Sequence, residues 1–177
     1  MKKIFIPILF LLSLNTVYGQ LSDPNIKTTI KKIYDNRDNL FKTFKGEKEP
    51  DLGLGLSPSY YTNIKLYNVK GSMDDNDFDE DMNFRISNAD HKKATKADWD
   101  KAFADMSESL RSNFSDLEVR ETKDDRTRTL TLFEKGKDTN APMADDNSPK
   151  YYITLQYKEE IEGFYSIFFM VISKKKK

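Results

Sequence analysis

The segment YYITLQYKEEIEGFYSIFFMVIS, residues Tyr151 to Ser173, decides the fold. Its first half alternates apolar and polar side chains with the period of two that is typical of a strand with one buried face. Residues 159–163 turn the chain into a second strand, Phe164 to Ile172, which is apolar on both of its faces. Such a strand is expected to be central in a sheet, or covered on both sides.

Two amphipathic helices are predicted upstream of this segment. The first spans residues 24–45: Asp23 is its N-cap, Pro24 occupies the first helical position, and apolar residues recur at spacings of three and four up to Phe44. The second spans residues 96–113 and begins with a capping box formed by Thr95 and Asp98. Its apolar side is made of Trp99, Ala102, Phe103, Met106, Leu110 and Phe114.

The other strands are predicted from short alternating segments. Residues 61–70 and 82–86 form one hairpin with a long acidic connection, and residues 117–134 form another. Residues 46–59 and 136–149 are rich in turn-forming residues and are predicted loops. The resulting order is α-β-β-α-β-β-β-β, without an internal repeat. It predicts an α+β fold, an antiparallel sheet of about six strands with two helices on one face.

The N-terminal segment has the features of a secretory signal peptide. Lys2 and Lys3 precede an apolar run from Ile4 to Leu14, and cleavage is expected after Gly19. The run is too short for a membrane anchor, which needs about 20 apolar residues. We expect an exported protein, periplasmic or extracellular and soluble after cleavage. Residues 1–19 are then the signal peptide, residues 20–173 a single α+β domain, and Lys174 to Lys177 a lysine tail.

Composition excludes several classes of function. The chain has 29 basic and 29 acidic residues, and loss of Lys2 and Lys3 would leave 27 basic residues. A near-neutral chain is not expected to bind nucleic acid, which requires a concentrated excess of positive charge. There is no cysteine. Disulfides, thiol catalysis, thiolate metal sites and a lipid anchor on a cleavage-site cysteine are therefore excluded.

The acidic segment from Asp74 to Asp81 is the most conspicuous candidate site. Alternate carboxylates at Asp75, Asp77 and Asp79 resemble the first ligands of a calcium-binding loop. Counted from Asp75, however, Glu80 stands where an EF-hand requires glycine, and Ile86 stands where it requires glutamate. We expect a solvated hairpin loop; the alternatives are a weak cation site and a docking surface for a basic partner.

The remaining candidate residues do not form a recognisable catalytic or binding motif. His91 is the single histidine and is expected in an exposed loop, and no Gly-x-Ser-x-Gly motif accompanies it. Gly53-Leu54-Gly55 is not followed by a Walker or dinucleotide-binding pattern, and Trp99 is expected in the core. No catalytic, cofactor-binding or metal site is predicted. A hydrolase that uses two distant carboxylates stays open, because such pairs leave no local pattern.

The leading functional hypothesis is a non-enzymatic exported domain that binds another macromolecule, with a protein as the expected partner. The alternative is a carrier of a small apolar ligand, with a pocket between helices and sheet closed by residues 52–56. A homodimer through the sheet face opposite the helices is a further option, because the last predicted strand is apolar on both faces and the helices cover only one.

Overall fold

The computed structural model describes residues 21–50, 58–75, 79–141 and 145–175. They form an α+β fold in which one eight-stranded antiparallel sheet has the strand order β1-β2-β3-β4-β8-β7-β6-β5. The strands are β1 (Lys45–Lys48), β2 (Ser59–Leu66), β3 (Val69–Asp75), β4 (Asp79–Ser87), β5 (Leu117–Lys123), β6 (Thr127–Glu134), β7 (Tyr151–Ile161) and β8 (Phe164–Lys174).

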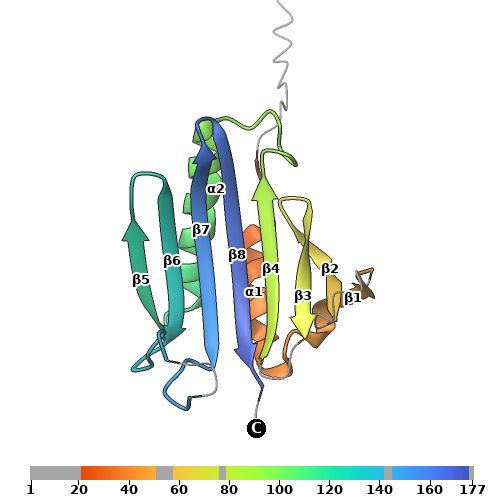
Figure 1. Cartoon of the computed structure of the whole chain (residues 1–177), viewed down its shortest axis with the longest axis vertical. Coiled ribbons are helices and arrows are strands. Elements are labelled where there is room, and N and C mark those ends of the chain that lie inside the picture. Colours follow the sequence, from red (N-terminus) through yellow and green to blue (C-terminus); the bar gives the residue numbers. More distant parts are fainter. Residues whose placement is uncertain (1–20, 51–57, 76–78, 142–144, 176–177) are drawn as a thin grey trace, which may run out of the picture.

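Both helices, α1 (Ile26–Asp35) and α2 (Lys96–Asn113), lie behind the sheet in Figure 1. Each helix is followed along the chain by four consecutive antiparallel strands, so the same helix-and-meander unit occurs twice. The two units join through β4 and β8, which pair antiparallel in the middle of the sheet. The β8 strand is therefore central, as its two apolar faces predict.

The prediction of about six strands is wrong, because the sheet has eight. The predicted strand 61–70 is in fact the hairpin of β2 and β3, because Tyr67 and Asn68 have φ values of 49° and 65° and reverse the chain in two residues. Two successive positive φ values suit the tight turn that matches strand twist. Without a glycine or proline at this turn, the sequence reads as one continuous strand.

The first helix is also shorter than predicted at both ends. It begins at Ile26 with Asn25 at the N-cap position, so Asp23 is not the N-cap and Pro24 is not in the helix. Leu40 and Phe41 adopt left-handed backbone conformations, with φ values of 58° and 54°, so a helix cannot continue to residue 45. Short 3-10 turns at Arg37–Asn39 and Lys42–Phe44 lead instead into the edge strand β1, which the sequence analysis missed. Phe41 and Phe44 are nevertheless buried, so the apolar spacing was correct although the backbone is not helical.

Other predictions are confirmed. The α2 helix has the predicted bounds, and its capping box is present: the Thr95 hydroxyl accepts a hydrogen bond from the Asp98 amide, while the Asp98 carboxylate accepts one from the Thr95 amide. The second hairpin is β5 and β6. The acidic connection is shorter than predicted, because Asp74 and Asp75 belong to β3 and Asp79 to Asp81 belong to β4.

The core lies between the helices and the sheet. It contains Ile30 and Ile33 of α1, Trp99 and Met106 of α2, and the rear-facing side chains of every strand except β1. Gly71 in β3 makes room for this packing, since a Cβ there would lie 2.8 Å from the Phe84 ring and 2.4 Å from the Asn83 carbonyl oxygen. Among the described residues, no helix is both long and apolar enough to cross a membrane.

Candidate functional site

The face of the sheet that points away from the helices is the main candidate site, and we call it the open face. Burial alternates along the central strands: Phe84 in β4 and Phe169 in β8 are fully buried on the helix side, whereas their sequence neighbours are half-buried or exposed. The strand registers connect these neighbours in rows across the sheet. The central row is Ser72, Asn83, Met170, Thr154 and Thr131.

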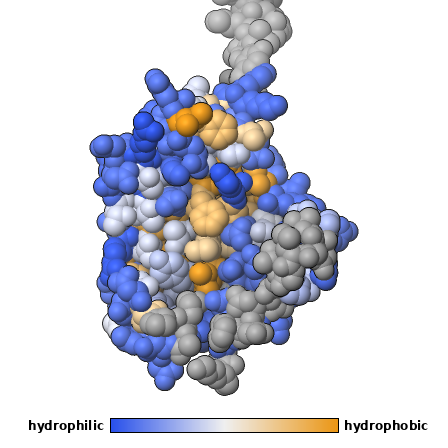
Figure 2. All heavy atoms as spheres, in the orientation of Figure 1, coloured by the Kyte–Doolittle hydropathy of each residue, from blue (hydrophilic) through white to orange (hydrophobic). Residues whose placement is uncertain are grey.

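An apolar stripe runs along β8 on the open face. It consists of the half-buried residues Phe164, Phe168, Met170 and Ile172. Figure 2 shows a narrow hydrophobic band down the middle of this face, at the place where Figure 1 has β8. On one side the stripe is bordered by hydroxyl and amide side chains of β6 and β7, namely Thr129, Thr131, Thr154 and Gln156. On the other side it is bordered by the charged residues of β3 and β4.

Three positive side chains, Lys65, Lys70 and Arg85, form a cationic corner of the open face. Lys65 and Lys70 are direct cross-strand partners. A depression of about 230 Å³ beside them is lined by Lys70, Arg85 and the ring of Tyr61, which is 40% exposed, and by the single carboxylate of Glu49. Arg85 lies 3.6 Å from Glu160, and 70% of its side chain is exposed, so this ion pair contributes little. The corner therefore presents positive charge to solvent.

Three carboxylates, Asp74, Asp79 and Asp81, form an anionic corner at the other end of β3 and β4. Asp74 and Asp81 are direct cross-strand partners, and Asp79 is paired in register with Lys174. Burial, with a further contribution from the negative charge of Asp74, raises the pKa of Asp81 to about 6. The structure thus brings together part of the predicted acidic segment, as strand residues rather than as a loop.

The raised pKa of Asp81 predicts a pH-dependent stability. The folded pKa exceeds the ordinary value of 3.8, so the ionised carboxylate destabilises the fold near pH 7, and this cost is relieved as the pH falls through 6 toward 4. We expect Asp81→Asn to stabilise the domain by about 1 kcal/mol at pH 7, after allowance for solvent screening. Urea unfolding at pH 7 and at pH 3.5 measures both values, at a protein concentration low enough for the chain to be monomeric.

The difference between Asp81→Asn and the wild type should almost disappear at pH 3.5, where the carboxylate is protonated in the folded state and mostly protonated in the unfolded state, whose pKa is near 3.8. Asp125→Asn, in the exposed β5–β6 turn, is the matched control and should change little at either pH. A stabilisation by Asp81→Asn that is equal at both pH values would contradict the electrostatic explanation.

His91 and Trp99 have structural positions. His91 Nε2 lies 2.9 Å from the Tyr67 carbonyl oxygen, and the His91 ring contacts Trp99 edge to face at 6.2 Å between centroids. The histidine is half-buried rather than exposed as predicted, and it links the β2–β3 turn to the start of α2. Trp99 is fully buried, as expected.

A second surface feature is a groove of about 600 Å³ between α2 and the β5–β6 hairpin. Phe103, Ala104 and Ser107 line it from α2. Two ion pairs cross from helix to sheet beside it: Arg111 with Glu121 at 2.5 Å, and Arg128 with Asp100. The groove is open to solvent, and the arginines at its border are already paired.

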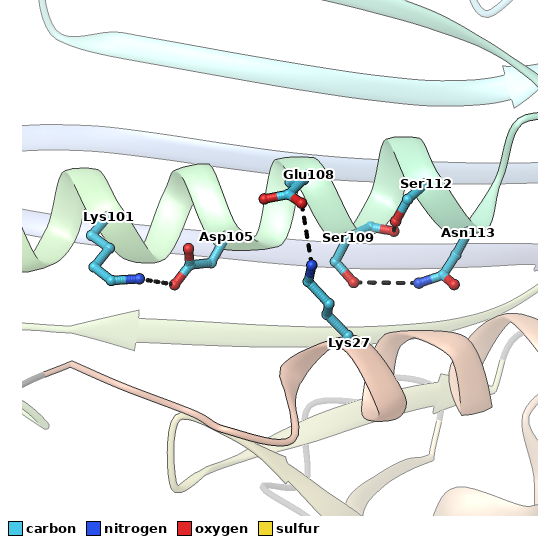
Figure 3. Close-up of polar contacts among 7 residues, drawn as sticks. All are labelled: Lys27, Lys101, Asp105, Glu108, Ser109, Ser112 and Asn113. Carbon is cyan, nitrogen blue, oxygen red and sulfur yellow. Dashed lines mark hydrogen bonds and ion pairs between the residues drawn. The ribbon is translucent and has the colours of Figure 1, made fainter.

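The exposed side of α2 carries ordinary surface contacts. Figure 3 shows Lys27 of α1 pointing toward Glu108 of α2, at 3.2 Å, and Lys101 paired with Asp105 one turn further along α2. Asn113 donates a hydrogen bond to the hydroxyl of Ser109, which is buried, within the helix. The two exposed ion pairs stabilise the helices by a few tenths of a kcal/mol each, and these contacts offer no catalytic arrangement.

A cluster at the C-terminal end of α1 was missed by the sequence analysis. The Arg37 guanidinium lies 3.5 Å from the centroid of the Tyr34 ring and 5.2 Å from that of Tyr151. The Tyr151 hydroxyl donates to Asp38 and thereby lowers the pKa of that carboxyl, whereas burial and a hydrogen bond to Asp116 raise the pKa of Tyr34 to about 12. The cluster ties α1 to β7. These two elements are too distant from each other in the sequence for a local pattern to reveal the cluster.

Several predicted features have no counterpart in a site. Among the described residues, no group of three or more His, Asp or Glu side chains is arranged to hold a metal ion. Gly53-Leu54-Gly55, the segment 52–56, the predicted signal peptide and Asp77 lie outside the described residues. Lys174, assigned to the tail, is the last residue of β8, and its ammonium group donates to the Ser148 hydroxyl at 2.7 Å.

No protein-family model and no curated protein matches this sequence.

Proposed function

We propose that this protein is an exported, non-enzymatic domain that binds another protein through the open face of its sheet. The apolar stripe on β8 is the observation that carries the proposal. In an antiparallel sheet with one covered face, the other face is ordinarily polar. Here two phenylalanines, a methionine and an isoleucine occupy its centre, although both helices lie on the opposite side.

The composition of the open face supports a protein partner. Aromatic residues, methionine and arginine are enriched in protein interfaces, and an apolar centre with a polar rim is their usual arrangement. The stripe provides the centre, while the threonines on one side and Arg85 on the other provide the rim. Export rests on the N-terminal pattern of Lys2, Lys3 and the apolar run that follows them.

A variant in the stripe tests this proposal. Mature protein from Gln20 to Lys177 is used as bait against envelope extract and spent medium, and bound proteins are identified by mass spectrometry. We expect a stoichiometric partner to be retained by the wild type and lost with Phe168→Glu, because a charge in the centre of the interface cannot be desolvated without a large cost.

The control for this capture is Lys92→Glu, an exposed loop position away from the open face. It should retain the partner. Both variants should keep the wild-type circular dichroism spectrum and melting temperature, since neither side chain belongs to the buried core. Capture that is equal with Phe168→Glu and wild type would contradict the proposed docking surface.

The second candidate function is a carrier of a small apolar ligand, and the groove beside α2 favours it. Its volume of about 600 Å³ lies in the range of ligand pockets, about 300–1,000 Å³. Native mass spectrometry of protein purified from its secreting host separates the two candidates. A carrier retains a bound small molecule of constant mass, and a protein-binding domain does not.

A further inference from the structure

We propose that the partner of the open face is a second copy of this chain, bound face to face about a two-fold axis. This inference rests on the proposed function, because it names the occupant of the same surface. Three observations point to a self-complementary surface: the opposed charges of its two corners, the like-charged pair within each corner, and its size.

The two charged corners lie at opposite ends of the same two strands. Lys70 and Asp74 are four residues apart on β3, and Arg85 and Asp81 are four residues apart on β4. At about 3.3 Å per residue, roughly 13 Å separates the positive from the negative charge on each strand. The open face of β3 and β4 is therefore positive at one end and negative at the other.

A two-fold axis that lies between the two sheets and crosses the strands at right angles matches these charges. It places each strand against its own copy, running in the opposite direction. With the axis over the row of Ser72, Asn83 and Met170, Lys70 faces the partner's Asp74, and Arg85 faces the partner's Asp81. Met170 meets its own copy and Phe168 meets the partner's Ile172, so the stripe is covered from Phe168 to Ile172. An axis parallel to the strands would instead set the charged half of the face against the threonines.

Each corner contains an unfavourable pair in the isolated chain. Lys65 lies directly opposite Lys70, and Asp74 lies directly opposite Asp81; like charges in such cross-strand positions are destabilising. Glu160 near Arg85 and Lys174 opposite Asp79 offset part of this charge. A partner that brings the opposite corner over each pair relieves the remaining repulsion.

The size of the surface is sufficient for a specific dimer. From β3 across β4, β8 and β7 to β6 there are five adjacent strands. With strands about 4.8 Å apart and about eight residues long, they span roughly 600 Å² per copy, or roughly 1,200 Å² in total, and Phe133 at the end of β6 is already covered within each chain. This is at the lower end of specific protein interfaces. Packed sheets also keep their strand directions within about 30° of one another, as the axis requires.

Association through a sheet edge is disfavoured in comparison. On the edge strand β5, the side chains of Glu118, Arg120, Glu121 and Lys123 are all exposed. Charged side chains of this kind prevent strands from pairing edge to edge. The other edge, β1, has only four residues and an irregular register with β2.

A charge-exchange experiment tests the dimer by sedimentation equilibrium of mature protein from Gln20 to Lys177. One variant, Lys70→Glu with Arg85→Glu, makes both corners negative. The other, Asp74→Lys with Asp81→Lys, makes both corners positive. We expect the wild type to be dimeric, each variant alone to dimerise about 100-fold more weakly or not at all, and their equimolar mixture to dimerise again, because like charges across an interface are repulsive and opposite charges are not.

The restored mixture shows that the variants are folded, and circular dichroism checks each of them alone. If the Asp74→Lys, Asp81→Lys variant does not fold, Asp74→Lys alone replaces it. A monomeric wild type, a dimer that survives in both variants, or a mixture that stays monomeric would each overturn this inference. The wild type could instead be monomeric and capture a different protein that Phe168→Glu no longer captures. That result would leave the proposed function intact and remove only the homodimer.

Discussion

Replacing Trp99 by alanine is expected to lower the free energy of unfolding by about 3–5 kcal/mol, the range for truncating a buried aromatic side chain. Trp99 is the largest fully buried side chain and lies on the side of α2 that packs against the sheet. The cavity left behind adjoins His91, whose ring contacts Trp99. Because small domains are stable by only about 5–15 kcal/mol, this change removes a large part of the total. Urea denaturation followed by circular dichroism measures it.

Two controls define the cause of this loss. Trp99→Phe should cost much less than Trp99→Ala, since it keeps most of the ring and removes an indole N–H that has no hydrogen-bond partner among the described residues. Ile161→Ala should cost less than about 0.5 kcal/mol, because this side chain is 65% exposed. Equal losses for Trp99→Ala and Ile161→Ala would show that burial on α2 does not stabilise the domain as the structure implies.

Gly71→Ala is expected to destabilise the domain by about 3 kcal/mol, the upper end of the usual cost of overpacking. The added Cβ would lie 2.4 Å from the Asn83 carbonyl oxygen and 2.8 Å from the Phe84 ring. The carbonyl belongs to the neighbouring strand β4 and cannot move without disturbing the pairing of β3 with β4. Thermal unfolding followed by circular dichroism should show a correspondingly lower melting temperature.

Gly136→Ala is the matched control for Gly71→Ala. Gly136 has φ of +75°, and no atom lies within 4 Å of its added Cβ. It should cost only about 1 kcal/mol, from the left-handed backbone alone. If Gly71→Ala proved as mild as Gly136→Ala, the close approach of β3 to β4 at this position would be refuted.

Local patterns predicted the elements whose signals are contained within one segment. The β7–β8 hairpin and the β5–β6 hairpin follow from alternation, and α2 follows from its apolar spacing and the capping box of Thr95 and Asp98. The prediction failed where backbone conformation contradicts side-chain spacing. Leu40 and Phe41 are apolar residues at helical spacing, yet their left-handed conformation ends the helix. Tyr67 and Asn68 form a turn that no glycine or proline marks.

The candidate site was predictable only in part. The two apolar faces of Phe164 to Ile172 indicate an uncovered apolar surface once the helices occupy one side. The charged corners were not predictable, because they depend on cross-strand register. Lys65 and Lys70 become partners only after the turn at Tyr67, and Asp74 faces Asp81 only because both belong to strands rather than to a loop.

The sequence by itself determined that β4 to β8 are strands with one or two apolar faces, where α2 begins and ends, and that the last strand is central. These properties follow from periodicity, because side-chain direction repeats every two residues in a strand and every 3.6 in a helix. Only the tertiary structure decided that there are eight strands, that β4 pairs with β8, and that positive and negative charges gather at opposite ends of the open face. Those features arise from contacts between distant segments, for which the order of residues along the chain carries no local signal.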